Sequence, residues 1–160
     1  LNPIMKFGFE AFCQKCVECG IDGVIIPDLP FKDYEETYKP IADRYDIRVI
    51  MLITPETSEA RVREIDEHTN GFIYMVSSAA TTGAQKDFDS QKQAYFKKIQ
   101  DMHLRNPRMV GFGISNKQTF DAACANSSGA IIGSRFVTLL NEAEGDAEKA
   151  ITQLKENVGR

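Results

Sequence analysis

Short apolar runs alternate with longer amphipathic stretches along the whole chain. Residues 8–19 place apolar side chains at the i, i+3, i+4, i+7 and i+8 spacing, which predicts a helix with one buried face. The next run, 23–27, is short and β-branched, which predicts a buried strand that opens into a loop. The same unit then recurs. Strands are predicted at 23–27, 48–53, 71–77, 108–112 and 129–132, and helices at 31–45 (interrupted at Pro40), 57–69, 90–104, 116–125 and 147–158, with a loop at 78–89.

The predicted strands are apolar throughout rather than alternating, which is typical of parallel strands covered on both faces. Strands interleaved with helices form either an open doubly wound sheet or part of a (β/α)8 barrel. Neither a linker nor a low-complexity segment divides the sequence. We therefore expect one α/β domain over residues 1–160.

Composition narrows the class of partner. The 160 residues are 42% hydrophobic and 26% charged, the proportions of an ordinary globular domain. A net charge of −4 argues against nucleic acid, because neutralising phosphates requires clustered Lys and Arg. No apolar run approaches the roughly 20 residues of a membrane span, and no signal segment opens the sequence. With four cysteines and no secretory context, we expect a cytoplasmic protein with reduced thiols.

Glycines follow three of the predicted strands, in loops that lead into helices. In parallel α/β folds ligands bind at the carboxyl ends of strands. Glycine lets a backbone N–H approach an anion closely, and a helix N-terminus adds donors and a positive dipole end. A single glycine of this kind more often only closes a tight turn. Because glycines follow both of the last two strands, a phosphate site and a purely structural role are about equally supported. The predicted phosphate donors are Gly83, Gly113, Gly133 and Ser134, the last also through its hydroxyl.

Other chemistries have weaker support. Cys13, Cys16 and Cys19 have the C-x-x-C-x-x-C spacing of iron–sulfur ligands. However, Cys13 and Cys16 fall on the apolar face of the predicted helix, where a free cysteine acts as a small hydrophobe, so we expect no metal. Neither histidine follows a strand, no lysine does, and no nucleophile elbow is present.

Two groups of strand-end residues remain as candidates. Asp28 is the one carboxylate that follows a predicted strand, although a carboxylate in that position is more often a loop cap. Apolar and aromatic side chains near the strand ends have a core role as their default, but could also line a pocket for an aromatic ligand. They are Ile25, Leu52, Tyr74, Phe112 and Ile131.

The ordered set of strand-end motifs resembles the α chain of tryptophan synthase over essentially the whole sequence. The segments that carry the resemblance are Asn2-Pro3-Ile4, Asp22 to Pro30, Gly71 to Tyr74, Thr82-Gly83-Ala84, Gly111 to Ser115, and Gly129 to Ser134. The resemblance implies strands four to eight of a (β/α)8 TIM barrel, an incomplete barrel of five parallel strands with flanking helices. The family is a lyase of tryptophan biosynthesis, which cleaves indole-3-glycerol phosphate to indole and glyceraldehyde 3-phosphate by a retro-aldol reaction.

The resemblance also assigns roles. It matches the phosphate donors to Gly83, Gly113, Gly133 and Ser134, and the indole pocket to the five strand side chains named above. It places Asp28 and Thr82 at the active-site mouth, Thr82 in a mobile loop. It implies no cofactor in this chain and a β-chain partner that holds pyridoxal phosphate. The family's catalytic Glu and Asp fall in a region before Leu1, so we expect no catalytic residue here and no turnover by the chain alone.

Five of eight strands cannot close a barrel, and the first and last strands would be open edges. We therefore expect a stable core only with a complementary piece or by self-association. Two other functions stay open. One is a different phosphate-binding barrel enzyme, which would usually offer Lys or more acidic residues on these strands. The other is a non-catalytic anion-binding module with an open doubly wound sheet.

Overall fold

The computed structural model describes residues 1–77, 85–111 and 113–160, and these residues form two compact units. The first unit comprises Leu1–Ile53, Thr57–Tyr74 and Arg105–Pro107, and the second comprises Thr54–Glu56, Met75–Leu104 and Arg108–Arg160. Each unit is described by itself. The single domain over 1–160 stays a prediction.

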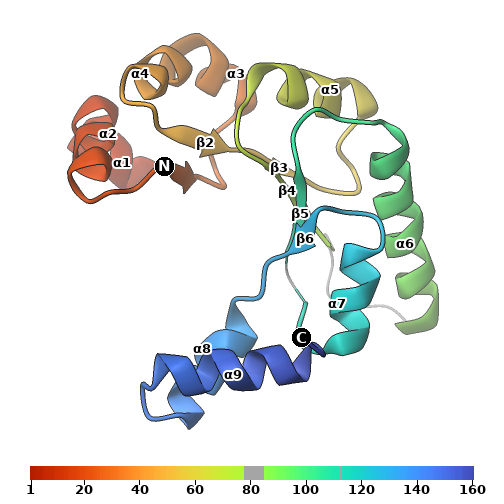
Figure 1. The fold of residues 1–160 in the computed structure, drawn as a ribbon. Helices are drawn as coiled ribbons and strands as arrows, with labels where there is room; N and C mark the ends of the chain where they lie inside the picture. The colour runs from red at the N-terminus through yellow and green to blue at the C-terminus, as the bar shows by residue number, and fades with distance from the viewer. Residues whose placement is uncertain (78–84, 112) are drawn as a thin grey trace. The chain divides into compact units, whose positions relative to one another are not determined.

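The first unit consists of short strands flanked by helices (Figure 1). Its elements are α1 (Asn2–Phe7), α2 (Phe9–Glu18), β1 (Gly23–Ile25), α3 (Phe31–Asp33), the π-helix η1 (Tyr34–Tyr38), α4 (Lys39–Arg44), β2 (Arg48–Ile50), β3 (Leu52–Ile53), α5 (Glu59–His68) and the first half of β4 (Ile73–Val76). The expected break at Pro40 takes another form. Residues 31–44 are helical without interruption, Pro40 is the second residue of α4, and the irregular turn is η1 directly before it.

The second unit holds the rest of β4 and the C-terminal elements (Figure 1). They are α6 (Gln85–Asp101), β5 (Arg108–Gly111), α7 (Lys117–Cys124), β6 (Gly129–Ala130), α8 (Ser134–Glu142) and α9 (Ala147–Asn157). Three predictions of element bounds were wrong. The loop expected through residue 89 is helical from Gln85, the strand expected at 48–53 is two strands separated at Met51, and the strand expected at 129–132 has two residues.

The strand pairings confirm the parallel arrangement. β1 pairs with β2 in parallel, with Ile25 opposite Ile50, and β5 pairs with β6 in parallel, with Met109 opposite Gly129. The strand order is β1-β2 in one sheet and β3-β4-β5-β6 in the other. The carboxyl ends of β5 and β6 therefore emerge at one edge of the sheet.

Buried side chains follow the predicted periodicity. On α2, Phe9, Cys13 and Cys16 are buried, as the helical pattern indicates. Within the second unit, α8 and α9 lie side by side around Leu139 and Ala150, both almost fully buried (Figure 1). Sequence reasoning missed both α8 and α1.

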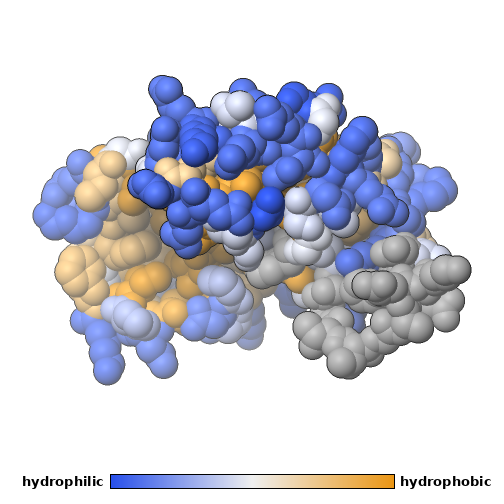
Figure 2. All heavy atoms as spheres, turned by 90° about the horizontal axis from the view of Figure 1, so that it is seen from below, coloured by the Kyte–Doolittle hydropathy of each residue, from blue (hydrophilic) through white to orange (hydrophobic). Residues whose placement is uncertain are grey.

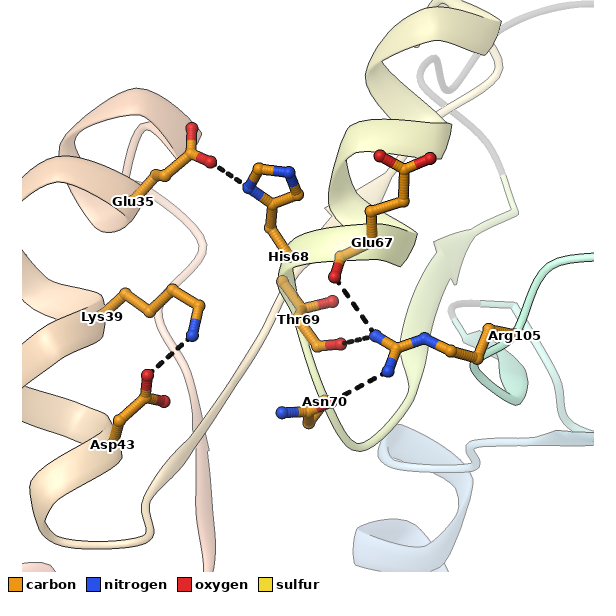
Figure 3. Close-up of polar contacts among 8 residues, drawn as sticks. All are labelled: Glu35, Lys39, Asp43, Glu67, His68, Thr69, Asn70 and Arg105. Atoms are coloured by element: carbon orange, nitrogen blue, oxygen red, sulfur yellow. Dashed lines mark hydrogen bonds and ion pairs between the residues drawn. The ribbon is translucent and has the colours of Figure 1, made fainter.

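A buried carboxylate fastens the end of α5 to the segment before β5. Asp66, only 8% exposed, accepts hydrogen bonds from the backbone N–H groups of Arg105 at 2.7 Å and Asn106 at 2.8 Å. The Arg105 guanidinium in turn donates to the carbonyl oxygens of Asp66 and Thr69, each at 2.7 Å, and so points at the C-terminal end of α5 (Figure 3). A cation there satisfies carbonyl groups that no helical N–H reaches and complements the helix dipole.

The outer edge of β1 is open in the described part of the chain. Ile25 at the end of β1 is 44% exposed, as expected for the first strand of an incomplete barrel. It borders a largely apolar groove of about 330 Å³, lined by Asp22, Gly23, Val24, Ile25, Arg48, Ile50, Gly71 and Phe72. Figure 2 shows hydrophobic residues reaching the surface on the face it draws. Such a groove beside an unpaired strand favours association.

We therefore expect the isolated chain to self-associate through this groove. Ile25→Lys, which places a charge in the groove, should lower the apparent mass in light scattering toward that of a monomer. Val17→Lys is the matched control, because Val17 on α2 is 51% exposed but does not line the groove. A wild-type chain that stays monomeric across the concentration range would contradict the prediction.

Candidate substrate-binding site

Asp28 lies in the turn after β1 and is an exposed carboxylate. Its two oxygens accept hydrogen bonds from the Leu1 amino group at 2.8 and 2.7 Å, and this contact lowers the pKa of the Asp28 carboxyl group. The side chain is 64% exposed, so water screens that charge strongly. An exposed, ionised carboxylate can position a ligand at the mouth of a site. Because this carboxylate is not buried, its pKa is not raised toward the value that a general acid or base needs for proton transfer.

Ile25 and Leu52, both predicted pocket residues, line different hollows. Ile25 borders the groove described above. Leu52 lines a second hollow of about 160 Å³ near the carboxyl ends of β1 and β2, with Ile26, Pro27, Leu29, Phe31, Met51, Thr57, Arg61 and Ile65. Neighbouring residues of a strand point to opposite faces, which explains why Ile25 and Ile26 face separate spaces.

The hollow beside Leu52 carries a cation that sequence reasoning missed. The Arg61 guanidinium lies 5.0 Å from the centre of the Phe31 ring and forms an ion pair with Glu64 at 2.9 Å. Arg61 belongs to α5, so no strand-end motif points to it. The hollow combines an apolar lining with one positive group, as a site for an aromatic anion would.

Tyr74 is a buried residue of β4, 9% exposed. Its backbone N–H donates to the Met51 carbonyl oxygen at 3.0 Å, and burial raises the pKa of its phenol. The side chain is therefore neutral at physiological pH. These properties fit both its default core role and the predicted role in an apolar pocket.

Gly113 requires glycine for its backbone conformation. Its φ is +73°, the left-handed region that other residues enter at a cost. A Cβ placed there would lie 3.9 Å from the Ser77 hydroxyl oxygen. Ser77 follows β4, is 3% exposed, and donates its backbone N–H to the Gly111 carbonyl oxygen at 3.1 Å. The residues that follow β4 and β5 thus lie beside one another.

Gly133 and Ser134 form the start of α8. Gly133 is its N-cap residue, with no side-chain cap, and Ser134 is its first helical residue. The N-terminus of α7 differs, because Asn116 and Thr119 form a capping box there and Thr119 also accepts from the Ser115 N–H. Thus α8 begins with backbone donors that no side-chain cap engages, the arrangement that suits an anion.

Ile131, the last pocket residue of this unit, lies between β6 and α8 and is half-buried. Its backbone N–H donates to the Val110 carbonyl oxygen at 2.8 Å, so pairing continues past the end of β6. Three predicted residues, Thr82, Gly83 and Phe112, lie outside the described residues.

The cysteine pattern has a packing explanation. All four cysteines are free thiols, and burial is the main cause that raises the pKa of Cys13 to about 11. A thiol that keeps its proton is a poor metal ligand. Across residues 1–77, 85–111 and 113–160, no three His, Cys, Asp or Glu side chains gather as a metal site would need. In the same ranges, every helix is too short or too polar to cross a bilayer.

The family model described as tryptophan synthase alpha chain matches residues 1–160. This chain belongs to the tryptophan synthase alpha chain family. Two relatives with this description are those of Bacteroides fragilis, 79% identical over 97% of this chain, and Bacteroides thetaiotaomicron, 78% identical over 98%. The chain spans only 59% and 60% of their respective lengths.

Solved structures of the family confirm the fold. The tryptophan synthase A-subunit of Pyrococcus furiosus matches 99% of this chain with a TM-score of 0.82 at 26% identity. The alpha chain of Legionella pneumophila matches 99% with a TM-score of 0.80 at 27% identity. This chain covers 64% and 60% of those two chains. It therefore forms part of a (β/α)8 barrel, with parallel strands and flanking helices, and the resemblance seen in the strand-end motifs is confirmed.

Proposed function

We propose that this chain provides the phosphate- and indole-binding part of an alpha chain that cleaves indole-3-glycerol phosphate to indole and glyceraldehyde 3-phosphate. This activity is a lyase step in tryptophan biosynthesis. The family match over all 160 residues and the 79% identity to the Bacteroides fragilis relative support the proposal.

The reaction breaks the bond between the indole ring and the glycerol phosphate carbon. The ring carbon gains a proton, and the neighbouring hydroxyl group loses one as it becomes the aldehyde. Both transfers need a general acid–base pair. Asp28 is exposed and is the one carboxylate that follows a predicted strand of this chain. Because the resemblance places the catalytic Glu and Asp outside these residues, this polypeptide should bind substrate without converting it.

The start of α8 is the observation that carries the proposal. Gly133 and Ser134 follow β6, Gly113 follows β5, and these two strands are parallel neighbours. Their loops leave the sheet at the same edge, and no side-chain cap engages the α8 donors. A phosphate dianion would accept these N–H groups and gain from the positive end of the helix dipole.

Inorganic phosphate should therefore shift the backbone amide resonances of Gly113 and Ser134 saturably at millimolar concentrations. Gly133→Asp should weaken binding about tenfold or more, because an N-cap carboxylate takes the same donors and repels the anion. The variant should fold, since Asp is a favourable N-cap residue and a Cβ at position 133 meets no atom within 4 Å.

Ser58→Asp is the matched control. It adds the same charge at the N-cap of α5, where Ser58 already accepts from the Arg61 N–H, and should leave phosphate binding unchanged. Absence of binding at tens of millimolar phosphate in the folded chain, or wild-type affinity in Gly133→Asp, would overturn the phosphate site.

We further propose that the complete protein works with a beta chain in the cytoplasm. A tryptophan synthase complex from Pyrococcus furiosus is among the structural matches, with a TM-score of 0.80 at 25% identity. The alpha chain would need no cofactor of its own, and pyridoxal phosphate would belong to the beta chain. Free thiols at all four cysteines are compatible with a reducing compartment.

A further inference from the structure

Cys19 is the residue of the C-x-x-C-x-x-C pattern that packing does not explain. Cys13 and Cys16 are 0% and 4% exposed on the inner face of α2. Cys19 follows them as the C-cap residue of the helix and is exposed. All three are free thiols. An exposed thiol is open to reagents dissolved in water, whereas a buried thiol is shielded from them.

The end of α2 is wound more tightly than the helix before it. The Cys19 N–H donates to the Lys15 carbonyl oxygen at 3.0 Å and also to the Cys16 carbonyl oxygen at 3.1 Å. The Gly20 N–H donates to the Val17 carbonyl oxygen at 3.0 Å. Two of these bonds join residues three apart, as in a 3₁₀-helix, in which the side chains at i and i+3 eclipse one another. Cys16 and Cys19 are such a pair, so this turn draws their side chains together.

Gly20 holds the turn in this form. Its φ is +70°, in the left-handed region that glycine enters without strain. The Ile21 N–H donates to the Cys16 carbonyl oxygen at 2.8 Å, and with the Gly20 bond this completes a Schellman motif. The close approach of residues 16 and 19 is therefore a defined feature of the backbone and not the fraying of a helix end.

The geometry of a disulfide separates the two candidate pairs. A disulfide needs Cβ atoms about 3.5–4.5 Å apart. Side chains three residues apart on a regular α-helix have Cβ atoms about 5–6 Å apart, too far for a bridge between Cys13 and Cys16 inside α2. The tightened turn shortens this separation for Cys16 and Cys19. A bridge between these two residues needs only a small movement at the end of the helix.

We propose that Cys16 and Cys19 form a reversible disulfide, with a low-molecular-weight disulfide such as oxidised glutathione as the oxidant. The Cys19 thiolate attacks one sulfur of the reagent, the other half leaves as a thiolate, and a mixed disulfide remains on Cys19. The Cys16 thiolate then attacks the Cys19 sulfur and displaces the second thiolate. The protons of the two cysteines pass to the two leaving thiolates, and the reagent gains the two electrons that the chain loses.

The burial of Cys16 sets the order of these steps. Burial, and secondarily the charge of Cys19, raise the pKa of the Cys16 thiol. At neutral pH this thiol keeps its proton, so closure of the bridge is slow and accelerates as the pH rises. The mixed disulfide on Cys19 therefore accumulates before the bridge. This inference is independent of the proposed lyase function.

Oxidised glutathione added to the reduced, folded chain tests the proposal. Samples are trapped with iodoacetamide at intervals, digested and mapped by mass spectrometry. A glutathione adduct on Cys19 should appear first, followed by a bridge between Cys16 and Cys19. Excess reduced glutathione should reverse both, because a bridge that is exposed at one end is readily reduced.

Two variants separate the two steps. Cys19→Ser should slow oxidation of the α2 peptide at least about tenfold, because only buried thiols remain there. This substitution lies at an exposed position, so the variant should fold. Cys16→Ala should leave the glutathione adduct on Cys19 as the end product, an outcome that a purely structural role of Cys16 does not produce. Circular dichroism checks that each variant is folded.

Cys124→Ser is the matched control. It removes a partly buried thiol from the second unit and should leave both steps on α2 unchanged. The proposal is overturned by a wild-type chain whose Cys19 stays unmodified or whose adduct never closes. It is also overturned by a bridge between Cys13 and Cys16, by a bridge between Cys19 residues of two copies, or by unslowed oxidation of the α2 peptide in Cys19→Ser.

Discussion

Replacing Asp66 with alanine should destabilise the chain by about 2–4 kcal/mol, the largest stability loss that we expect from a single polar substitution. The Asp66 carboxylate accepts two backbone N–H groups, from Arg105 and Asn106, and also the Asn106 side-chain amide at 2.9 Å. Asn106 is 6% exposed, so its N–H cannot turn to water when the carboxylate is removed. The buried donors then remain unpaired.

Urea unfolding followed by circular dichroism measures this loss as a lower midpoint. Asp66→Asn should fall between the wild type and Asp66→Ala, because its amide oxygen can accept from one of the two N–H groups. Glu67→Ala is the matched control on the same helix. The Glu67 side chain is exposed and only its backbone carbonyl contacts Arg105, so we expect a change within about 0.5 kcal/mol. Equal midpoints for Asp66→Ala and Glu67→Ala would show that the contact does not stabilise the fold.

Lyase activity should be undetectable with the isolated chain and should appear when the rest of the barrel is supplied. The complementing piece is the part of the Bacteroides fragilis relative that its 155-residue match leaves out. This piece would contribute the acid–base pair that the resemblance places outside these 160 residues. General acid–base catalysis is worth about 10²–10⁴-fold in rate, and closing the barrel would also cover the groove beside β1.

Indole release from indole-3-glycerol phosphate measures the gain. Gly133→Asp in the complemented enzyme should raise KM, because it removes phosphate contacts, whereas Ser58→Asp should match the wild type. Indole formation by the isolated chain would contradict the expected need for outside carboxylates. A complemented complex that binds phosphate but forms no indole would instead favour the non-catalytic anion-binding alternative.

The sequence determined where most helices lie and how their buried faces are composed. The pattern at 8–19 predicts α2 with Phe9, Cys13 and Cys16 buried, and these three residues are buried. Ser58 and Asn116 cap α5 and α7 through side-chain hydrogen bonds to the third helical residue. These features are local, because a helix brings residues three and four apart together whatever the rest of the chain does.

Short segments that depend on pairing were predicted less well. The run at 48–53, five apolar residues after Arg48, gives one strand by pattern but two strands, β2 and β3, in the structure. α8 was missed, although Phe136, Leu139, Leu140 and Ala143 have helical spacing. The sequence pattern was interpreted as a loop at Gly133, whereas Gly133 is the N-cap residue of α8.

The sequence by itself determined the parallel α/β class, the family, and the glycine turns at the strand ends, because order along the chain encodes all three. Only the tertiary structure decided which side chains share a space. It placed Ile25 and Leu52 in different hollows and set Arg61 beside Phe31. Such contacts join residues far apart in sequence, and their partners depend on strand register and on the face each side chain takes.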